Sequence, residues 1–227
     1  MRELLLKICP YAIWCITLCE TIIAALLFTL WKRDRRPIAL LSFFLTLGLI
    51  LDAAVIGLGA VMPAGILAAV SPVRFIAHGL LIPLLFPICG YALGLNKTVM
   101  KVLWIVTVVL MTAGAAQGAC TVLEPRDIAG VIRFAAGEGT PAWAGMISTV
   151  LSFGTVIPMM IAGAYIWIRQ KTPCFFLSGF FMFVFSALGP ATGNTDLIFF
   201  ISMFGELFME LFLYLYSRRR GGTSVSV

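Results

Sequence analysis

The sequence predicts an all-α membrane protein in which seven transmembrane helices form one bundle. Of the 227 residues, 61% are hydrophobic and 11% are charged, whereas ordinary globular chains have about 25% charged residues. The mean hydropathy is +1.06, and apolar runs of about 20 residues, each able to cross about 30 Å of hydrocarbon, recur along the chain. We therefore expect one transmembrane domain at residues 1–217, followed by a flexible cytoplasmic tail at 218–227.

The distribution of basic residues predicts the orientation of the bundle, because cytoplasmic loops carry an excess of lysine and arginine. The chain has 16 basic residues. Eleven of them fall on one predicted side: Lys32, Arg33, Arg35, Arg36, Lys97, Lys101, Arg169, Lys171, Arg218, Arg219 and Arg220. Assigning this side to the cytoplasm places the N-terminus outside and the C-terminus inside. The net charge of +6 then reflects orientation and contact with anionic lipid, and no binding of nucleic acid is expected.

The apolar runs predict helices at 9–31, 37–60, 72–95, 102–122, 143–168, 174–188 and 199–216. The first run ends at the basic stretch 32–36 and is too long for the apolar core of a cleavable signal peptide. Pro83 and Pro87 predict a kink in the third helix, where neighbouring helices satisfy the freed carbonyl groups. The second half of the fourth helix, 114–119, is a run of small residues suited to close helix packing.

The longest connection is the predicted outer loop 123–141. Its segment EPRDIAGVIRF has apolar side chains at roughly helical spacing, namely Ile128, Val131, Ile132 and Phe134. We expect a short amphipathic helix at the membrane interface, acting either as a connector or as a lid. The fifth helix carries hydroxyl groups in its first half, and the sixth is expected to break at Gly189–Pro190 before a tight outer turn.

Six ionisable residues lie inside or at the edge of the predicted helices: Glu20, Asp52, Arg74, His78, Glu206 and Glu210. Charged side chains in membrane spans are costly, so they normally face the bundle interior and pair with one another. Because Glu206 and Glu210 are four residues apart, they stack on one face of the last helix. The predicted depth, from outside inward, is Arg74, His78, Asp52, Glu20 with Glu206, and Glu210. Such a graded series on four helices is typical of a proton or cation path.

Simpler roles are open for several of these residues. Arg74 would snorkel to the outer headgroups, and His78 would be a hydrogen-bonded core histidine. Glu20 and Glu206 would be protonated packing groups. A further alternative is a divalent cation held by Glu20, Asp52, His78 and Glu206.

Catalytic and metal motifs are absent from the sequence. It has no GxSxG elbow, no HExxH and no phosphate-binding glycine loop, and its six cysteines form no CxxC pair. We therefore predict no catalytic residues, no bound metal and no cofactor. Cys9 and Cys120 both fall near the outer face, which leaves a disulfide between them open.

Three predicted helices contain short motifs, at Arg74-Phe75, at 185–187 and at Glu206, that resemble the microbial rhodopsins, which are seven-helix proteins with the N-terminus outside. In the third helix, Arg74-Phe75 is followed by Pro83, nine residues after the arginine. In the sixth helix, the stretch 185–187 (Phe-Ser-Ala) precedes Pro190, one position later than in the family's motif. In the seventh, Glu206 stands where the family has a carboxylate four residues before its retinal-binding lysine.

The departures from that family limit what the resemblance implies. Glu210 occupies the lysine position, and the predicted helix 199–216 contains no lysine, so no covalent retinal is expected. The family's acidic counter-ion in the third helix falls at Ala77. The resemblance implies a lysine-less relative in which Arg74, Asp52 and Glu206 form a retained polar centre.

Three hypotheses of function follow. The first is an integral membrane transporter or channel-like protein that moves protons or a small cation along the six residues, with Arg74 as an outer electrostatic gate or partner. The second is a sensor that binds a lipid, pigment or small cation between the third, fifth, sixth and seventh helices. The third is an intramembrane lipid-modifying enzyme with Asp52 and His78 as general base. The expected partners are the lipid bilayer and a small ion or lipophilic ligand, and a homo-oligomer is compatible with the sequence. Short loops favour a bacterial-type inner cell membrane.

Overall fold

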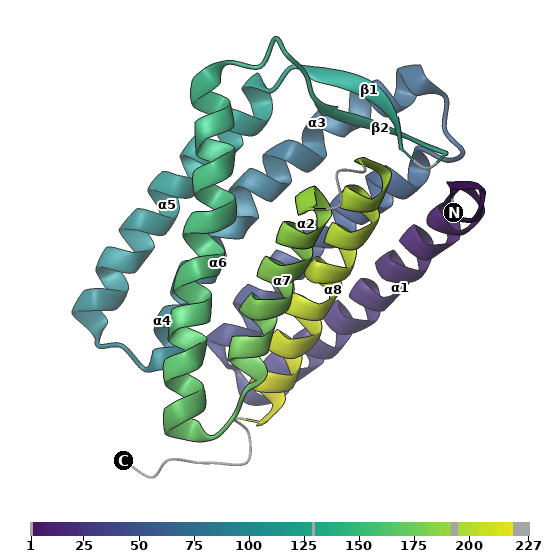
Figure 1. Ribbon diagram of the computed structural model, residues 1–227. Helices are drawn as coiled ribbons and strands as arrows, with labels where there is room; N and C mark the ends of the chain where they lie inside the picture. The colour runs from purple at the N-terminus through teal and green to yellow at the C-terminus, as the bar shows by residue number, and fades with distance from the viewer. Residues whose placement is uncertain (1, 129, 192–194, 220–227) are drawn as a thin grey trace.

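The computed structural model describes residues 2–128, 130–191 and 195–219, and the side chains of 8–128, 130–187 and 200–219. Its helices run up and down in alternation, with a two-stranded sheet across one end (Figure 1). The elements are α1 (Arg2–Asp34), α2 (Pro37–Leu58), α3 (Ala64–Leu81), the 3-10 turn η1 (Ile82–Leu84), α4 (Leu85–Leu93), α5 (Lys97–Cys120), β1 (Leu123–Ile128), β2 (Val131–Ala136), α6 (Ala142–Gln170), α7 (Cys174–Ala191) and α8 (Thr195–Arg219).

Within the described residues, six helical segments are long and apolar enough to cross a membrane, with α3, η1 and α4 counted as one. The described side chains of α7, Cys174–Ala187, form a further apolar stretch. α7 ends at Ala191, one residue past the Gly189–Pro190 pair where the sequence predicts a break. The fold is therefore a helical one of the multi-pass membrane type, with a small sheet added.

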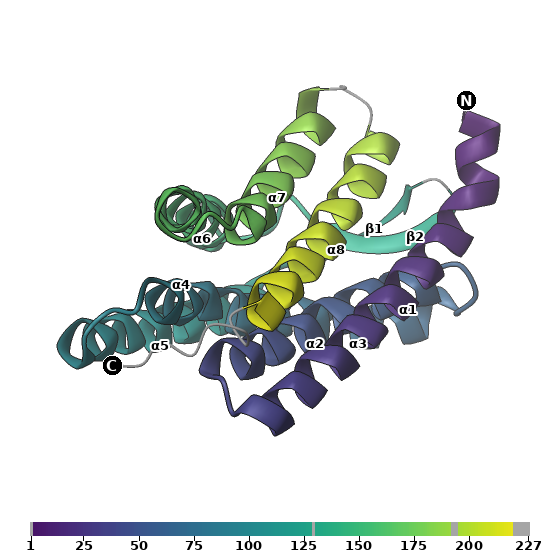
Figure 2. The ribbon, with the colours of Figure 1, turned by 90° about the horizontal axis from the view of Figure 1, so that it is seen from below.

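The helices form two layers, which are seen end on in Figure 2. One layer holds α1 to α5, and the other holds α6, α7 and α8. Contacts of α8 with α1 and α2, and of α6 with α4 and α5, join the two layers. The largest buried cluster includes Leu45 and Leu49 of α2, Ile88 of α4, Met159 of α6 and Tyr216 of α8.

The third predicted helix begins earlier than expected and is interrupted as expected. α3 starts at Ala64, directly after Pro63 in an extended conformation, and Pro72 lies inside the helix. The kink predicted at Pro83 is present as the turn η1, which separates α3 from α4. Gly94 then ends α4 with a φ of 69°, a left-handed conformation typical of helix C-termini.

The segment 123–136 is a β-hairpin, so the prediction of an amphipathic interfacial helix is wrong. β1 and β2 pair antiparallel, with Ile128 opposite Val131. Gly130 has a φ of 80°, and its N–H donates to Asp127 Oδ1 at 3.1 Å. This turn chemistry favours a hairpin, and the β-branched residues that follow favour a strand over a helix.

The hairpin covers the end of the bundle where α1 begins, opposite the end where α8 stops (Figure 1). Its Ile128 and Val131 are buried against a cluster that includes Ile13 of α1, Ile56 of α2 and Met203 of α8. The backbone of Ile132 also donates to the carbonyl oxygen of Gly59 at 3.2 Å. The hairpin is thus packed onto three helices and is part of the core.

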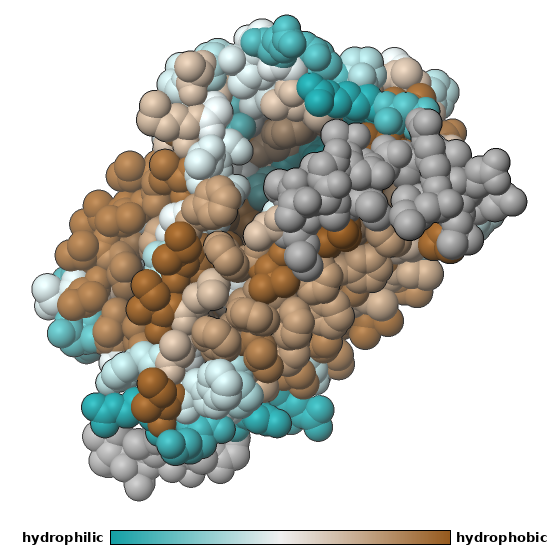
Figure 3. Space-filling model, viewed as in Figure 1, coloured by the Kyte–Doolittle hydropathy of each residue, from teal (hydrophilic) through white to brown (hydrophobic). Residues whose placement is uncertain are grey.

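The surface between the two ends of the bundle is apolar, as Figure 3 shows for one face. Large apolar side chains in the middle of α5 and α6 are exposed, including Val109 at 61% and Ile161 at 68%. Contiguous exposed apolar surface of this kind marks contact with an apolar phase. It indicates contact of the helices with a lipid bilayer.

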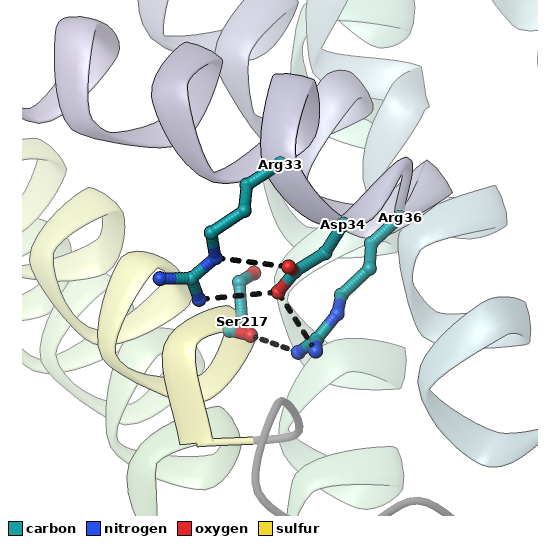
Figure 4. A network of polar contacts seen from close by, with 4 residues as sticks. All are labelled: Arg33, Asp34, Arg36 and Ser217. Atoms are coloured by element: carbon teal, nitrogen blue, oxygen red, sulfur yellow. Dashed lines mark hydrogen bonds and ion pairs between the residues drawn. The ribbon is translucent and has the colours of Figure 1, made fainter.

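At the opposite end from the hairpin, polar contacts join the α1–α2 turn to α8 (Figure 4). Asp34 accepts from Arg33 at 2.9 Å and from Arg36 at 2.9 Å. Arg36 Nη1 also donates to the carbonyl oxygen of Ser217 at 2.8 Å, in the last turn of α8, where carbonyls lack helical partners. α8 continues to Arg219, and residues 220–227 of the predicted tail lie outside the described residues.

The predicted small-residue packing in 114–119 is confirmed by a glycine pair. A methyl group added to Gly79 of α3 would meet the carbonyl oxygen of Gly114 on α5, and one added to Gly114 would meet that of Gly79. The two backbones are therefore in direct contact.

Gly79→Ala and Gly114→Ala should each lower the free energy of unfolding in detergent by about 1–3 kcal/mol, because the added methyl group overpacks the contact. Thermal unfolding followed by intrinsic fluorescence measures this change. The matched control is Gly145→Ala on α6, where a side chain would meet nothing within 4 Å. Equal unfolding temperatures for all three variants would contradict the close contact.

Candidate functional site

The outer part of the site is a buried ion pair between α2 and α3. Arg74 Nε donates to Asp52 Oδ1 at 2.7 Å, and the two side chains are 4% and 12% exposed. Arg74 Nη1 donates to the carbonyl oxygen of Phe134 at 3.1 Å, and the guanidinium carbon lies 4.6 Å from the centre of the Phe75 ring. Arg74 is therefore held inside the protein, and the snorkelling alternative is wrong.

Arg133 of β2 is a charged residue of this site that is not among the six residues predicted from the sequence. Its guanidinium interacts electrostatically with Arg74, Asp52 and Glu206. Burial, and then the nearby positive charge of Arg74, lower the pKa of Arg133 to about 10. A prediction of a hairpin at 123–136 would have placed Arg133 over the bundle. The prediction of an amphipathic helix rests on the neighbouring apolar residues and assigns no position to Arg133.

The inner part of the site consists of carboxyl groups on α1 and α8. Glu20 and Glu210 are both 0% exposed. Among the described residues, none donates a hydrogen bond to either carboxyl group. Thr46 of α2 lies beside the Glu210 carboxyl group but outside hydrogen-bonding geometry.

These carboxyl groups belong to the same electrostatic cluster as the ion pair. The charge of Asp52 acts on Glu20 and on Glu206, and both Glu20 and Glu206 act on Glu210. His78 is also within electrostatic reach of Asp52. All six residues predicted from the sequence therefore lie in one cluster, between the α1–α5 layer and the α8 side of the other layer.

A cavity of about 230 Å³ lies beside this cluster. His78 and Glu206 line it, together with hydroxyl groups from α6 and α7 and a mostly apolar remainder. The lining residues are Leu49, His78, Ile82, Leu85, Ser152, Phe153, Thr155, Val156, Met182, Phe183, Ser186, Glu206 and Met209. The cavity is thus bounded by the third, fifth, sixth and seventh predicted helices, which the second hypothesis of function names, and also by Leu49 of α2. Asp52 is not among the lining residues, so His78 and Asp52 do not meet in this cavity as the lipid-enzyme hypothesis would require.

Neither a divalent cation site in the cluster nor a disulfide between Cys9 and Cys120 is formed by the described residues. In the part of the chain that is described, no three His, Cys, Asp or Glu side chains converge closely enough to hold a metal ion. The alternative of a divalent cation held jointly by Glu20, Asp52, His78 and Glu206 is therefore wrong. The structure also shows no disulfide between Cys9 and Cys120, both of which are described.

The chain was also compared with known proteins. No model of a protein family matches it, and no curated protein matches it.

Removing one member of the Asp52–Arg74 pair should leave the other charge buried without its partner. Asp52→Asn and Arg74→Gln should each lower the free energy of unfolding by about 3–5 kcal/mol, and the double variant should lose less than the sum of the two. Unfolding in detergent measures all three values. Arg126→Gln, an exposed position on β1, is the control and should unfold like the parent. Additive losses in the double variant would contradict a direct pair.

Proposed function

We propose that the protein spans the cell membrane seven times, with its N-terminus outside and its C-terminus in the cytoplasm, and moves protons or a small cation along the intramembrane cluster. α7 packs along both α6 and α8, and its described stretch Cys174–Ala187 is apolar, which supports counting it as a seventh span. Arg36 of the α1–α2 turn donates to the carbonyl oxygen of Ser217 (Figure 4), so the basic residues of this turn lie at the same end as Arg218 and Arg219 of α8, which supports assigning this end to the cytoplasm. The short connections between helices fit a bacterial-type inner membrane.

The observation that carries the proposed transport is that the carboxyl groups of Glu20 and Glu210 are buried with no hydrogen-bond partner among the described residues. Buried polar side chains in proteins nearly always have hydrogen-bond partners, so exceptions require an explanation. Ionisable groups inside membrane spans are rare, and they commonly mark ion pathways and proton relays. Two such groups lie on neighbouring helices and interact electrostatically with Glu206. They are well explained as protonation sites that bind and release a proton in turn.

The arrangement suggests a route for the transported ion. Glu206 borders the cavity, and it interacts electrostatically with Asp52 on the hairpin side and with Glu20. Glu210 lies one turn further along α8, toward the proposed cytoplasmic end. Arg74 and Arg133 place positive charge at the hairpin end, where it would repel metal cations. A metal cation needs several oxygen ligands at once, whereas a proton needs one carboxyl group at a time, so the proposal favours protons.

Glu206→Gln should abolish proton flux while the protein remains folded. A glutamine amide cannot take up a proton from the cavity and release it to Glu20. The measurement is acidification of sealed proteoliposomes that contain a pH-sensitive dye. Glu20→Gln and Glu210→Gln should reduce the flux in the same assay. Glu138→Gln, an exposed glutamate outside the cluster, is the matched control and should conduct like the parent. A folded Glu206→Gln variant with full flux would refute the proposed path.

A second candidate function is the binding of a small ligand in the cavity. Ligand sites are typically apolar concavities with a few converging polar groups, and this cavity combines apolar walls with His78, Glu206 and three hydroxyl side chains. The resemblance to microbial rhodopsins supports the same position, although with Glu210 in place of the lysine any such ligand would bind without a covalent bond.

If the cavity binds a ligand, purified parent protein should carry a co-purifying compound that Ser186→Phe loses, because the larger ring fills the cavity. Absorbance and mass spectrometry of solvent extracts measure this difference. Ala187→Phe is the control, since Ala187 neighbours Ser186 but is exposed and does not line the cavity. Extracts of parent and Ser186→Phe with the same content would count against ligand binding at this position.

A further inference from the structure

A groove of about 130 Å³ between α1 and α8 lies at the end of the bundle opposite the hairpin. Its α1 wall consists of Leu26, Thr29, Leu30 and Arg33, and its α8 wall of Tyr214 and Arg218. The spacing of three and four residues places each set on one face of its helix. None of these residues belongs to the cluster or to the cavity described above, so the groove is a separate feature.

The groove is graded from apolar to positively charged along the helices. Leu26 and Leu30 lie deeper in the bundle, two and one helical turns before Arg33 respectively. Arg33 and Arg218 stand in the last turns of α1 and α8, so both charges are at the same end. An amphiphile with an apolar chain and a negatively charged head matches this gradient.

The Arg33 guanidinium is hydrogen-bonded to Asp34 and has donors to spare. Asp34 accepts from its Nε at 2.9 Å and from its Nη2 at 3.2 Å. A guanidinium has five N–H donors, so three are left, and Figure 4 shows the remaining terminal nitrogen pointing away from Asp34. Asp34 is itself shared with Arg36, which ties this turn to the end of α8. Arg33 therefore has donors left over, and it lines the groove together with Arg218.

The charge at the mouth of the groove is net positive even when Asp34 is included, because Arg33, Arg36 and Arg218 outnumber the single carboxylate. Other basic side chains in the same turn are directed elsewhere. The Lys32 ammonium lies 4.8 Å from the centre of the Phe28 ring, and the Arg35 guanidinium lies 4.8 Å from that of Trp31. Guanidinium groups bind phosphate oxygens well, and the facing leaflet of a cell membrane carries anionic phospholipid.

We propose that the groove between α1 and α8 is a binding site for one anionic phospholipid, with the phosphate bound by Arg33 and Arg218 and an acyl chain lying along Leu26 and Leu30. The hydroxyl of Tyr214 stands on the wall of the groove, where it can donate to a headgroup oxygen. Bound in this way, the lipid would join α1 to α8, the two helices that carry Glu20 and Glu210.

The test is native mass spectrometry of the full chain, released from vesicles of equal parts phosphatidylglycerol and phosphatidylcholine. The parent should retain one phosphatidylglycerol molecule. Arg33→Gln and Arg218→Gln should each reduce this adduct about fivefold, since a basic residue near a membrane surface contributes about 1 kcal/mol to binding of anionic lipid. Thr29→Phe should also remove the adduct, because it fills the groove without changing any charge.

The control is Arg169→Gln, which lies at the same end of the bundle but stacks on Tyr165 of α6 outside the groove. It should keep the adduct at the level of the parent. Loss of the adduct in Arg169→Gln to the same extent would overturn the site in favour of general attraction to a basic surface. An unchanged adduct in Thr29→Phe would overturn it as well. Displacement of the lipid by millimolar inorganic phosphate would show that the groove takes free phosphate and would overturn the proposal of a lipid.

Discussion

The ion pair between Asp52 and Arg74 constrains the hairpin end of the structure. A guanidinium inside an apolar bundle has to meet acceptors within the protein, because no water is available to replace them. Asp52 supplies one acceptor, the Phe75 ring supplies a π-face, and the carbonyl oxygen of Phe134 supplies the third contact. That last contact comes from the backbone of β2. The hairpin is therefore required in its position, and its apolar side chains complete the core around it.

The two ends of the cluster differ in how their charges are satisfied. Near the hairpin, the negative charge of Asp52 is surrounded by Arg74 and Arg133, so this part is electrostatically compensated and rigidly bonded. Deeper in the bundle, Glu20 and Glu210 lie between the helix layers with no donor among the described residues. A fully satisfied polar network specifies one structure, whereas a partly satisfied one leaves its members able to change protonation or partner. This difference supports assigning structural roles to the outer pair and transport to the inner carboxyl groups.

Hydropathy was enough to predict the helices and the six ionisable residues, because both depend on the cost of placing polar groups in an apolar span. The segment 123–136 was mispredicted for a physical reason. Over so few residues, apolar positions fit a period of 3.6 and a period of 2 almost equally well, and the left-handed Gly130 decides for the hairpin. Arg133 was missed with it, because its place over the bundle depends on that turn. The cavity depends on the packing of side chains from seven elements, which no local pattern contains.

Glu206 connects the two candidate functions, since it lines the cavity and also belongs to the carboxyl cluster. A carboxyl group at the wall of a cavity can exchange protons with water inside it, and a ligand that occupied the cavity would displace that water. The same ligand would change the dielectric around Glu206 and the strength of its interaction with Glu20. Ligand binding and proton transfer would then be linked, because each would alter the free energy of the other through one side chain. A ligand that fills the cavity would block proton entry to Glu20 and Glu210. Occupancy of the cavity would therefore regulate proton transfer along the proposed path.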